Sequence, residues 1–241
     1  MNSPPLLRLR QLVVHRSSRA VLCGVDVQVG AGERWVIRGG VGAGKSTLLH
    51  ATLGLLPATA GEIELLGRVC RSEADFALCR GPVGLLFQDP DDQLIAPTVL
   101  EDVEFGPLNL GWSAARAHEA ADAVLANLDL AALADRPVHE LSGGEKRLVA
   151  LAGLLVMQPK LLLLDEPTES LDAITVARIL RVLGASGLPM LIATHDPRCI
   201  DALATRCVTL EDGRIASHRP QADRSPATDC SSMVEEPAAS S

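Results

Sequence analysis

The sequence contains the run Gly39-Gly40-Val41-Gly42-Ala43-Gly44-Lys45-Ser46-Thr47. An apolar pattern typical of a short strand, residues 34–37, precedes it, and an apolar helical pattern, residues 46–56, follows it. The run matches the spacing G-x-x-x-x-G-K-[ST], in which glycines let successive backbone N–H groups point into one hollow of anion size. We therefore predict that all of these residues bind the phosphates of a nucleotide at the N-terminus of the helix.

Two residues of this run have expected chemical roles. Lys45 would place its charge against the β- and γ-phosphates and assist catalysis, and the Ser46 hydroxyl would coordinate Mg²⁺. ATP and Mg²⁺ are therefore the expected cofactors. The alternative is a glycine-rich turn that holds a lysine by chance, and the flanking strand and helix patterns count against it.

A second motif lies further along the chain, where four leucines, residues 161–164, are followed by Asp165 and Glu166. A fully apolar strand can deliver such acids to the carboxyl edge of a parallel sheet, where ligands bind. We expect Asp165 to hold Mg²⁺, through water, and Glu166 to polarise the attacking water as the general base. Without the phosphate-binding run upstream, an acidic helix cap after a core strand would explain the same residues.

The rest of the chain alternates between strand and helix patterns. Helices are expected at residues 113–128, 148–157 and 174–183, and the remaining strands at residues 6–14, 21–29, 61–65, 190–193 and 208–210. This alternation indicates an α/β fold with a largely parallel central sheet, and residues 61–65 indicate a smaller antiparallel layer.

The bulk properties exclude several classes of protein. The chain has 241 residues and a formal net charge of −8, which makes it a poor candidate for non-specific nucleic-acid binding. The N-terminal sequence lacks the order of a signal peptide. The longest apolar run, residues 148–157, is too short to span a bilayer, so we expect a soluble chain whose membrane role would need a partner. The six cysteines form no CxxC pair, which counts against a zinc site.

A third motif separates this chain from other proteins with a phosphate-binding loop. Leu141-Ser142-Gly143-Gly144-Glu145, placed before the acidic strand, resembles the signature motif of ABC ATPases. The resemblance implies that Ser142, Gly143 and Gly144 contact the γ-phosphate of a nucleotide held by a second subunit, arranged head to tail. The dipole of the helix that begins there would add to the positive charge around that phosphate.

Three further positions fit the same resemblance. Gln88 matches the glutamine that senses Mg²⁺ and the attacking water, His195 matches the histidine that bonds the γ-phosphate, and Asp172 belongs to a loop that crosses the dimer interface near the nucleotide. The family implies a P-loop NTPase fold with a RecA-like core, an antiparallel β layer and a helical subdomain. We assign residues 6–217 to this ATP-binding domain, with the helical subdomain at about residues 89–157, and expect a disordered tail at residues 218–241.

Residues 87–111 carry a narrower resemblance, to the ATPases of energy-coupling-factor importers and most closely to those for cobalt and nickel uptake. It implies a peripheral subunit on the cytoplasmic face of the membrane, paired with a second ATPase subunit that is a copy or a paralogue. It also implies a transmembrane subunit and a small substrate-capturing membrane protein. The cargo would be a transition metal ion such as cobalt or nickel, or a vitamin such as biotin, and the ATPase chain itself does not contact it.

The sequence departs from the family pattern at three positions. Arg16 lies at or near the place of the aromatic residue that usually stacks on adenine, and a guanidinium can also stack on a purine. Leu148 stands where Arg is common, which we expect to change the surface charge near the partner interface. Glu169 stands where small residues are more usual, and the sequence offers no physical reason for it.

Two other classes of function are alternatives to a transport ATPase. A soluble ABC ATPase that acts on nucleic acid or ribosomes usually has two cassettes, a coiled coil or a basic arm, and this acidic chain has a single cassette. A P-loop kinase for a small molecule would not need the signature motif or His195. The sequence therefore favours an ATPase that powers uptake.

Overall fold

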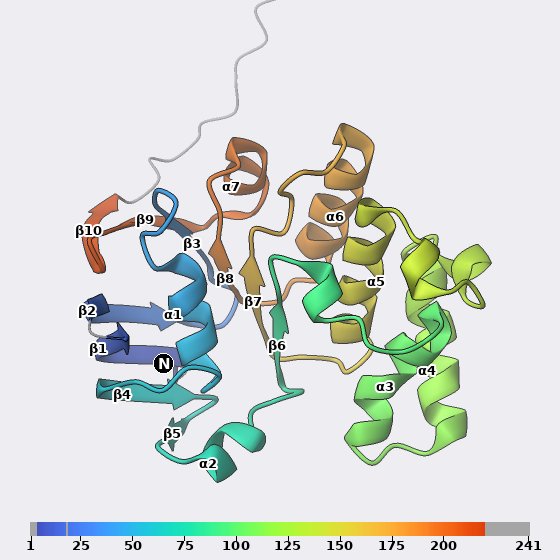
Figure 1. Cartoon of the computed structure of the whole chain (residues 1–241), viewed down its shortest axis with the longest axis horizontal. Helices are drawn as coiled ribbons and strands as arrows, with labels where there is room; N and C mark the ends of the chain where they lie inside the picture. The colour runs from blue at the N-terminus through green and yellow to red at the C-terminus, as the bar shows by residue number, and fades with distance from the viewer. Residues whose placement is uncertain (1–3, 18, 220–241) are drawn as a thin grey trace, which may run out of the picture.

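The computed structural model describes residues 4–17 and 19–219, which form two sheets and the helices around them (Figure 1). The smaller sheet is antiparallel and has the strand order β2-β1-β4-β5. Its strands are β1 (Leu7–Arg16), β2 (Arg19–Val29), β4 (Ala60–Leu65) and β5 (Arg68–Cys70). The predicted antiparallel layer is therefore present, and it includes the first two strands of the chain.

The larger sheet has the strand order β10-β9-β3-β8-β7-β6, and all neighbours except the β9–β10 hairpin are parallel. This confirms the predicted α/β fold with a largely parallel sheet. Its strands are β3 (Arg34–Arg38), β6 (Val83–Leu86), β7 (Leu161–Asp165), β8 (Met190–Ala193), β9 (Arg206–Glu211) and β10 (Arg214–Arg219).

The larger sheet is apolar because both of its faces are covered. Alternate side chains of β7 enter two different clusters: Leu161 and Leu163 face the antiparallel sheet and helix α1 (Lys45–Thr52), while Leu162 and Leu164 face the helices on the other side of the sheet. All four leucines have an exposed fraction of 0%. The carboxyl end of β7 therefore leaves the core at a fixed point, which is where Asp165 and Glu166 lie.

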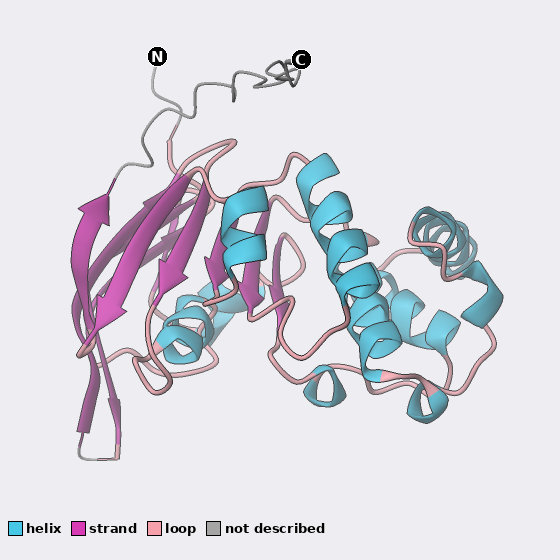
Figure 2. Cartoon of the chain, turned by 90° about the horizontal axis from the view of Figure 1, so that it is seen from above, coloured by secondary structure: helices cyan, strands magenta, loops and turns pink. Residues whose placement is uncertain are grey.

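The helices surround this sheet and extend beyond it on one side. They are α1 (Lys45–Thr52), α2 (Glu73–Ala77), α3 (Val99–Asn109), α4 (Ala114–Asn127), α5 (Gly143–Leu155), α6 (Ala173–Ala185) and α7 (Pro197–Leu203), with short 3₁₀ turns at Pro90–Asp92, Ala131–Leu133 and Val138–Glu140. Figure 2 shows strands gathered at one end of the molecule and helices alone at the other. That helical end contains α3, α4 and the start of α5, within the predicted helical subdomain at residues 89–157.

Local chemistry explains where two helices differ from their predicted bounds. Helix α1 ends at Thr52 rather than at residue 56, because Gly54 turns the chain with φ +72° and the Phe76 ring occupies the space that a side chain there would need. Helix α5 begins at Gly143, in the signature motif as the resemblance implied and before the apolar run at residues 148–157, because Ser142 and Glu145 cap each other in a capping box.

Strand β10 extends to Arg219, two residues past the predicted end of the domain at residue 217. The rest of the predicted tail, residues 220–241, lies outside the described residues.

Candidate active site

Residues 39–44 of the glycine-rich run form a loop between β3 and α1, and the last three residues of the run begin α1. Gly42 and Gly44 adopt φ values of +78° and +102°, which favour glycine, and a side chain at Gly39 would meet the Leu210 carbonyl oxygen at 2.5 Å. The Lys45 ammonium reaches back over the loop and donates to the Gly39 carbonyl at 2.8 Å. Residues 39–47 all line one cavity, of about 480 Å³, which is a size suited to a small ligand.

Four side chains from other parts of the chain line the same cavity: Gln88, Glu166, Glu169 and His195. The carboxyl ends of parallel strands meet at one edge of a sheet, and this edge faces the loop. Arg16, at the end of β1, lines the cavity too. The structure therefore brings together the predicted phosphate loop, the predicted general base, two further predicted residues and the residue expected near the base of the nucleotide.

Glu166 is held between Lys45 and His195. Its Oε1 lies 3.5 Å from Lys45 Nζ and 3.0 Å from His195 Nδ1, and its side chain is only 6% exposed. Its backbone adopts φ +42°, a region that side chains rarely occupy, and the Glu166 N–H donates to the Ala193 carbonyl. The strained turn points the carboxylate into the cavity rather than along the strand.

His195 follows β8 and covers this carboxylate from the solvent side. The hydrogen bond with Glu166, followed by the charge of that carboxylate, raises the pKa of His195 above its ordinary value. The ring is 64% exposed and has only Nδ1 bound to Glu166, so Nε2 remains directed away from that bond. The arrangement suits a histidine that contacts a phosphate oxygen.

Asp165 lies beside Ser46 at the end of β7 and is 1% exposed. Burial raises its pKa, although a hydrogen bond from Ser46 opposes that effect. Its Oδ1 is buried and has no hydrogen-bond partner among the described residues. Carboxylate, hydroxyl and amide oxygens are ligands that suit Mg²⁺, so Asp165, Ser46 and Gln88 fit that ion.

Within the described residues, no group of three or more His, Cys, Asp or Glu side chains is placed to hold a metal ion.

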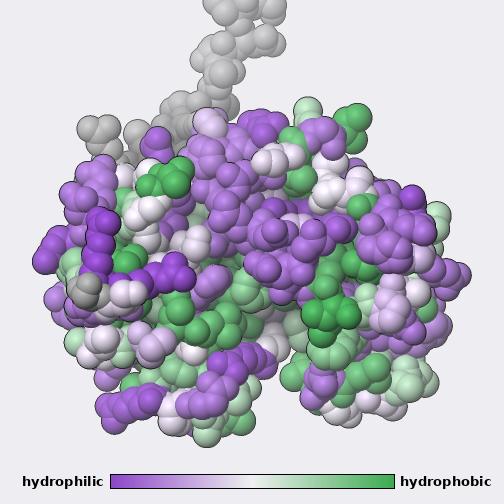
Figure 3. Space-filling model, in the orientation of Figure 1, coloured by the Kyte–Doolittle hydropathy of each residue, from purple (hydrophilic) through white to green (hydrophobic). Residues whose placement is uncertain are grey.

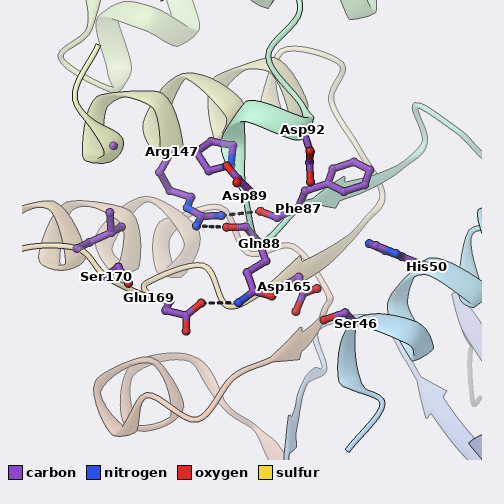
Figure 4. A pocket seen from close by; sticks show the side chains of 13 residues that line it. Ser46, His50, Phe87, Gln88, Asp89, Asp92, Arg147, Asp165, Glu169 and Ser170 are labelled. Carbon is purple, nitrogen blue, oxygen red and sulfur yellow. Dashed lines mark hydrogen bonds between the residues drawn. The ribbon is translucent and has the colours of Figure 1, made fainter. Parts of the chain in front are cut away.

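Gln88 is held at both its backbone and its side chain (Figure 4). The Arg147 guanidinium donates to the carbonyl oxygens of Phe87 and Gln88, and Gln88 Nε2 donates to Glu169 Oε2 at 2.7 Å. Sequence reasoning missed Arg147, which is 4% exposed. The available signal for Arg147 was its positive charge among the apolar residues that follow the signature motif.

The expected effect of Leu148 on surface charge is wrong. Leu148 is only 2% exposed and packs in the core on the inner face of α5. The cation of this helix is Arg147 instead, and it points toward the loop that holds Gln88.

Five predicted residues do not line this cavity. Asp165 and Gly143 line an adjoining pocket together with Ser46 and Gln88, whereas Ser142, Gly144 and Asp172 line neither. Ser142 and Gly143 are exposed at the start of α5, and Asp172 caps α6 by accepting from the N–H groups of Ile174 and Thr175. In one chain these residues therefore have local roles at helix ends. Their placement leaves them available to a nucleotide held elsewhere.

The structure also shows a contact that the sequence did not suggest, between the loop after Glu166 and the loop that holds His195. The Thr168 hydroxyl, 1% exposed, donates to Asp196 Oδ2 at 2.7 Å. Asp196 in turn caps α7, directly after His195. This bond fixes the loop that follows Glu166 against the loop that holds His195.

The protein-family model described as ABC transporter matches residues 22–169, which contain the phosphate loop, the signature motif and the acidic strand. The chain belongs to the ABC transporter family. It is an ATP-binding subunit of this family and therefore an ATPase. Within the described residues of this ABC ATPase, no helix combines the length and the apolar character needed to cross a membrane.

Three curated relatives show where the ABC ATPase lies within the family. It is 48% identical, over 88% of each chain, to a putative ABC transporter ATP-binding protein of Brucella suis. It is 45% identical to the cobalt import ATP-binding protein CbiO of Rhodobacter capsulatus, over 79% of this chain and 70% of the relative. It is 40% identical to the energy-coupling factor transporter ATP-binding protein EcfA of Methanocaldococcus jannaschii, over 81% of this chain and 72% of the relative.

Two solved structures have the same fold. CbiO1 of Clostridium perfringens, described as part of the ABC transporter complex CbiONQ, superposes with a TM-score of 0.79 at 33% identity, covering 90% of this chain and 88% of that one. A dimeric ATP-binding cassette bound to ADP and phosphate, in a post-hydrolysis state, has a TM-score of 0.79 at 26% identity, covering 89% of this chain and 98% of that one.

Proposed function

We propose that this ABC ATPase powers the uptake of a small cargo through a membrane-embedded partner. The cargo would be a transition metal ion such as cobalt or nickel, or a vitamin such as biotin. The names of the relatives, which include cobalt import and energy-coupling factor, support this assignment. The observation that carries it is an apolar groove beside the loop that holds Gln88.

The groove lies between the strand layer and the helical end of the molecule. Its lining includes Leu55, Ile95, Phe105 and Met157. Ile95 is 65% exposed and Phe105 is 47% exposed. Figure 3 shows hydrophobic residues at the hollow between the regions of α2 and α3.

We propose that a cytoplasmic helix of the transmembrane subunit docks in this groove. Gln93 connects the groove to the active site, because its side chain accepts from the Phe87 N–H and donates to the Ala150 carbonyl. Phe87 precedes Gln88, so a partner in the groove would sense movement of the loop that meets Mg²⁺ and the γ-phosphate. The ATPase would thus lie peripherally at the cytoplasmic face of the membrane.

Hydrolysis would proceed in a composite site made by two ATPase subunits, arranged head to tail. Lys45 and the loop N–H groups would bind the β- and γ-phosphates of ATP, and Ser142, Gly143 and Gly144 of the second subunit would close over the γ-phosphate. Glu166 would take a proton from the attacking water, while His195 would bond the γ-phosphate. Mg²⁺, held by Ser46, Gln88 and Asp165, would neutralise charge on the phosphates.

The docking assignment is tested by Ile95→Asp. Burying the exposed part of Ile95 would contribute about 1–2 kcal/mol, and a buried, unpaired carboxylate would cost more. We expect the variant to bind ATP normally, to lose co-purification with the transmembrane subunit and to abolish uptake in cells. Leu78→Asp is the matched control, because Leu78 is 62% exposed and does not line the groove. An Ile95→Asp protein that still assembles and transports would refute docking at this groove.

The chemistry is tested separately by Glu166→Gln. The amide cannot accept a proton at neutral pH, so turnover should disappear while ATP binding remains. Both sites of a dimer would then stay filled, and gel filtration with MgATP should show a dimer for the variant only. Turnover at the wild-type rate would exclude Glu166 as the general base.

A further inference from the structure

Glu169 contacts Gln88 directly, although nothing in the family pattern gives this position a role. Gln88 Nε2 lies 2.7 Å from Glu169 Oε2, and the two residues come from loops 81 positions apart in the sequence. Glu169 is half-buried and lines the cavity of the phosphate loop together with Gln88, Glu166 and His195. The contact therefore lies within the candidate active site, on its solvent-accessible side.

The chemistry of the two groups fixes the orientation of the Gln88 amide. An ionised carboxylate can only accept hydrogen bonds, whereas an amide has a donor end and an acceptor end. Glu169 therefore selects the orientation in which Nε2 faces the carboxylate. The oxygen at the opposite end of the amide, Oε1, then faces the other side of the cavity.

Figure 4 shows the Gln88 amide between Glu169 on one side and Asp165 and Ser46 on the other. Those two residues are the ones that fit Mg²⁺, and an amide oxygen is a suitable ligand for this ion while an amide nitrogen is not. The backbone of Gln88 is meanwhile anchored by Arg147 through the Phe87 and Gln88 carbonyl groups. With the backbone anchored, the side-chain amide is the part whose orientation remains to be set.

We propose that Glu169 is a positioning residue, which orients the Gln88 amide so that its oxygen is presented to Mg²⁺ bound with ATP. The proposal deepens the proposed function, because it rests on Gln88 meeting the metal. It assigns to Glu169 no contact with the nucleotide. It also explains why an acid is useful at this position, since a small residue could not reach Gln88.

A simpler role for the Glu169 charge predicts a different result. A carboxylate that only repelled phosphate would weaken binding of ATP with or without the metal, and its effect would not depend on Gln88. An orienting residue acts on the gain in affinity that Mg²⁺ provides, and only while Gln88 is present. The quantity that separates the two roles is the ratio of nucleotide affinity with Mg²⁺ to affinity without it.

The experiment measures binding of a non-hydrolysable ATP analogue by calorimetry, with Mg²⁺ and with EDTA. Loss of the hydrogen bond in Glu169→Ala should lower the Mg²⁺-dependent gain in affinity about threefold to tenfold. Glu169→Gln keeps the reach but replaces the acceptor-only carboxylate with an amide that can face Gln88 with either end, so its gain should fall between those of the wild type and Glu169→Ala. In a Gln88→Ala background, Glu169→Ala should lower the gain no further. Thermal unfolding of each variant controls for loss of fold.

Three results would overturn the proposal. The first is an unchanged gain in Glu169→Ala while Gln88→Ala lowers it, which leaves the metal role of Gln88 standing and removes Glu169. The second is additivity of Glu169→Ala with Gln88→Ala, which indicates an effect of charge that does not pass through Gln88. The third is a normal gain in Gln88→Ala itself, which removes the metal role of Gln88 and the proposal with it.

Discussion

Replacing Arg147 by Met should destabilise the protein and free the loop that holds Gln88. The guanidinium is 4% exposed and donates to the carbonyl oxygens of Phe87 and Gln88. Two hydrogen bonds from a charged group contribute about 1.5–3 kcal/mol each, so their loss is worth roughly 3–6 kcal/mol before any offset. The cost of burying the guanidinium offsets part of this stabilisation, since desolvation lowers the pKa of Arg147 and its Nε has no partner among the described residues.

We expect a net loss of about 2–4 kcal/mol, which for a chain of this length lowers the melting temperature by roughly 5–15 °C. The assay is thermal unfolding without nucleotide. Arg181→Met is the matched control, because Arg181 is 69% exposed and its ion pair with Asp129 spans 3.7 Å. ATP turnover should fall in Arg147→Met as well, since the backbone of Gln88 loses its anchor. Melting temperatures within about 1 °C for the two variants would refute this reasoning.

Three further predictions concern the site itself. Lys45→Ala should lose nucleotide affinity, whereas Ser142→Arg should keep it. A mixture of the two inactive proteins should recover some ATPase activity, because one composite site of the mixed dimer is made of intact halves. No recovery in proven mixed dimers would contradict a head-to-tail pair. In competition titrations, GTP should compete measurably with ATP, and Arg16→Ala should weaken binding of both nucleotides. Sharp selection of ATP, together with unchanged binding in Arg16→Ala, would place another residue against the base. Glu166→Gln should lower the pKa of His195 toward its ordinary value, as followed by NMR titration of the ring, because the raised pKa reflects that carboxylate. In the wild type, the ion pair between protonated His195 and Glu166 is present below the raised pKa of His195 and is lost as pH rises through it. An unchanged titration in the variant would exclude this ion pair.

Short-range patterns were sufficient for much of the fold. The phosphate loop, the leucine strand before Asp165 and the alternation of strands and helices each depend on spacing within about a dozen residues. Such patterns report backbone freedom and the side of an element that must be buried, and these are local properties. The parallel sheet followed from them, because strands joined by helices return in the same direction.

The helix bounds show the limit of this reasoning. The apolar pattern alone placed the start of α5 at residue 148, and the earlier start came only from the signature motif, in which Ser142 and Glu145 have the spacing of a capping box. It extended α1 past Gly54, because the Phe76 ring that packs over that glycine comes from a later segment. A strand at Arg214–Arg219 was also missed, since its hairpin with β9 offers no long apolar alternation.

The sequence by itself determined which residues can bind phosphate, accept a proton or coordinate Mg²⁺, because those abilities belong to side chains and to short motifs. Only the tertiary structure decided how Gln88 is held, since Arg147 and Glu169 lie 59 and 81 positions away along the chain. It likewise decided that Leu148 faces the core and that Thr168 meets Asp196. Contacts of this kind arise where loops from separate strands converge at one edge of a sheet, and the packing of the whole core sets their distances.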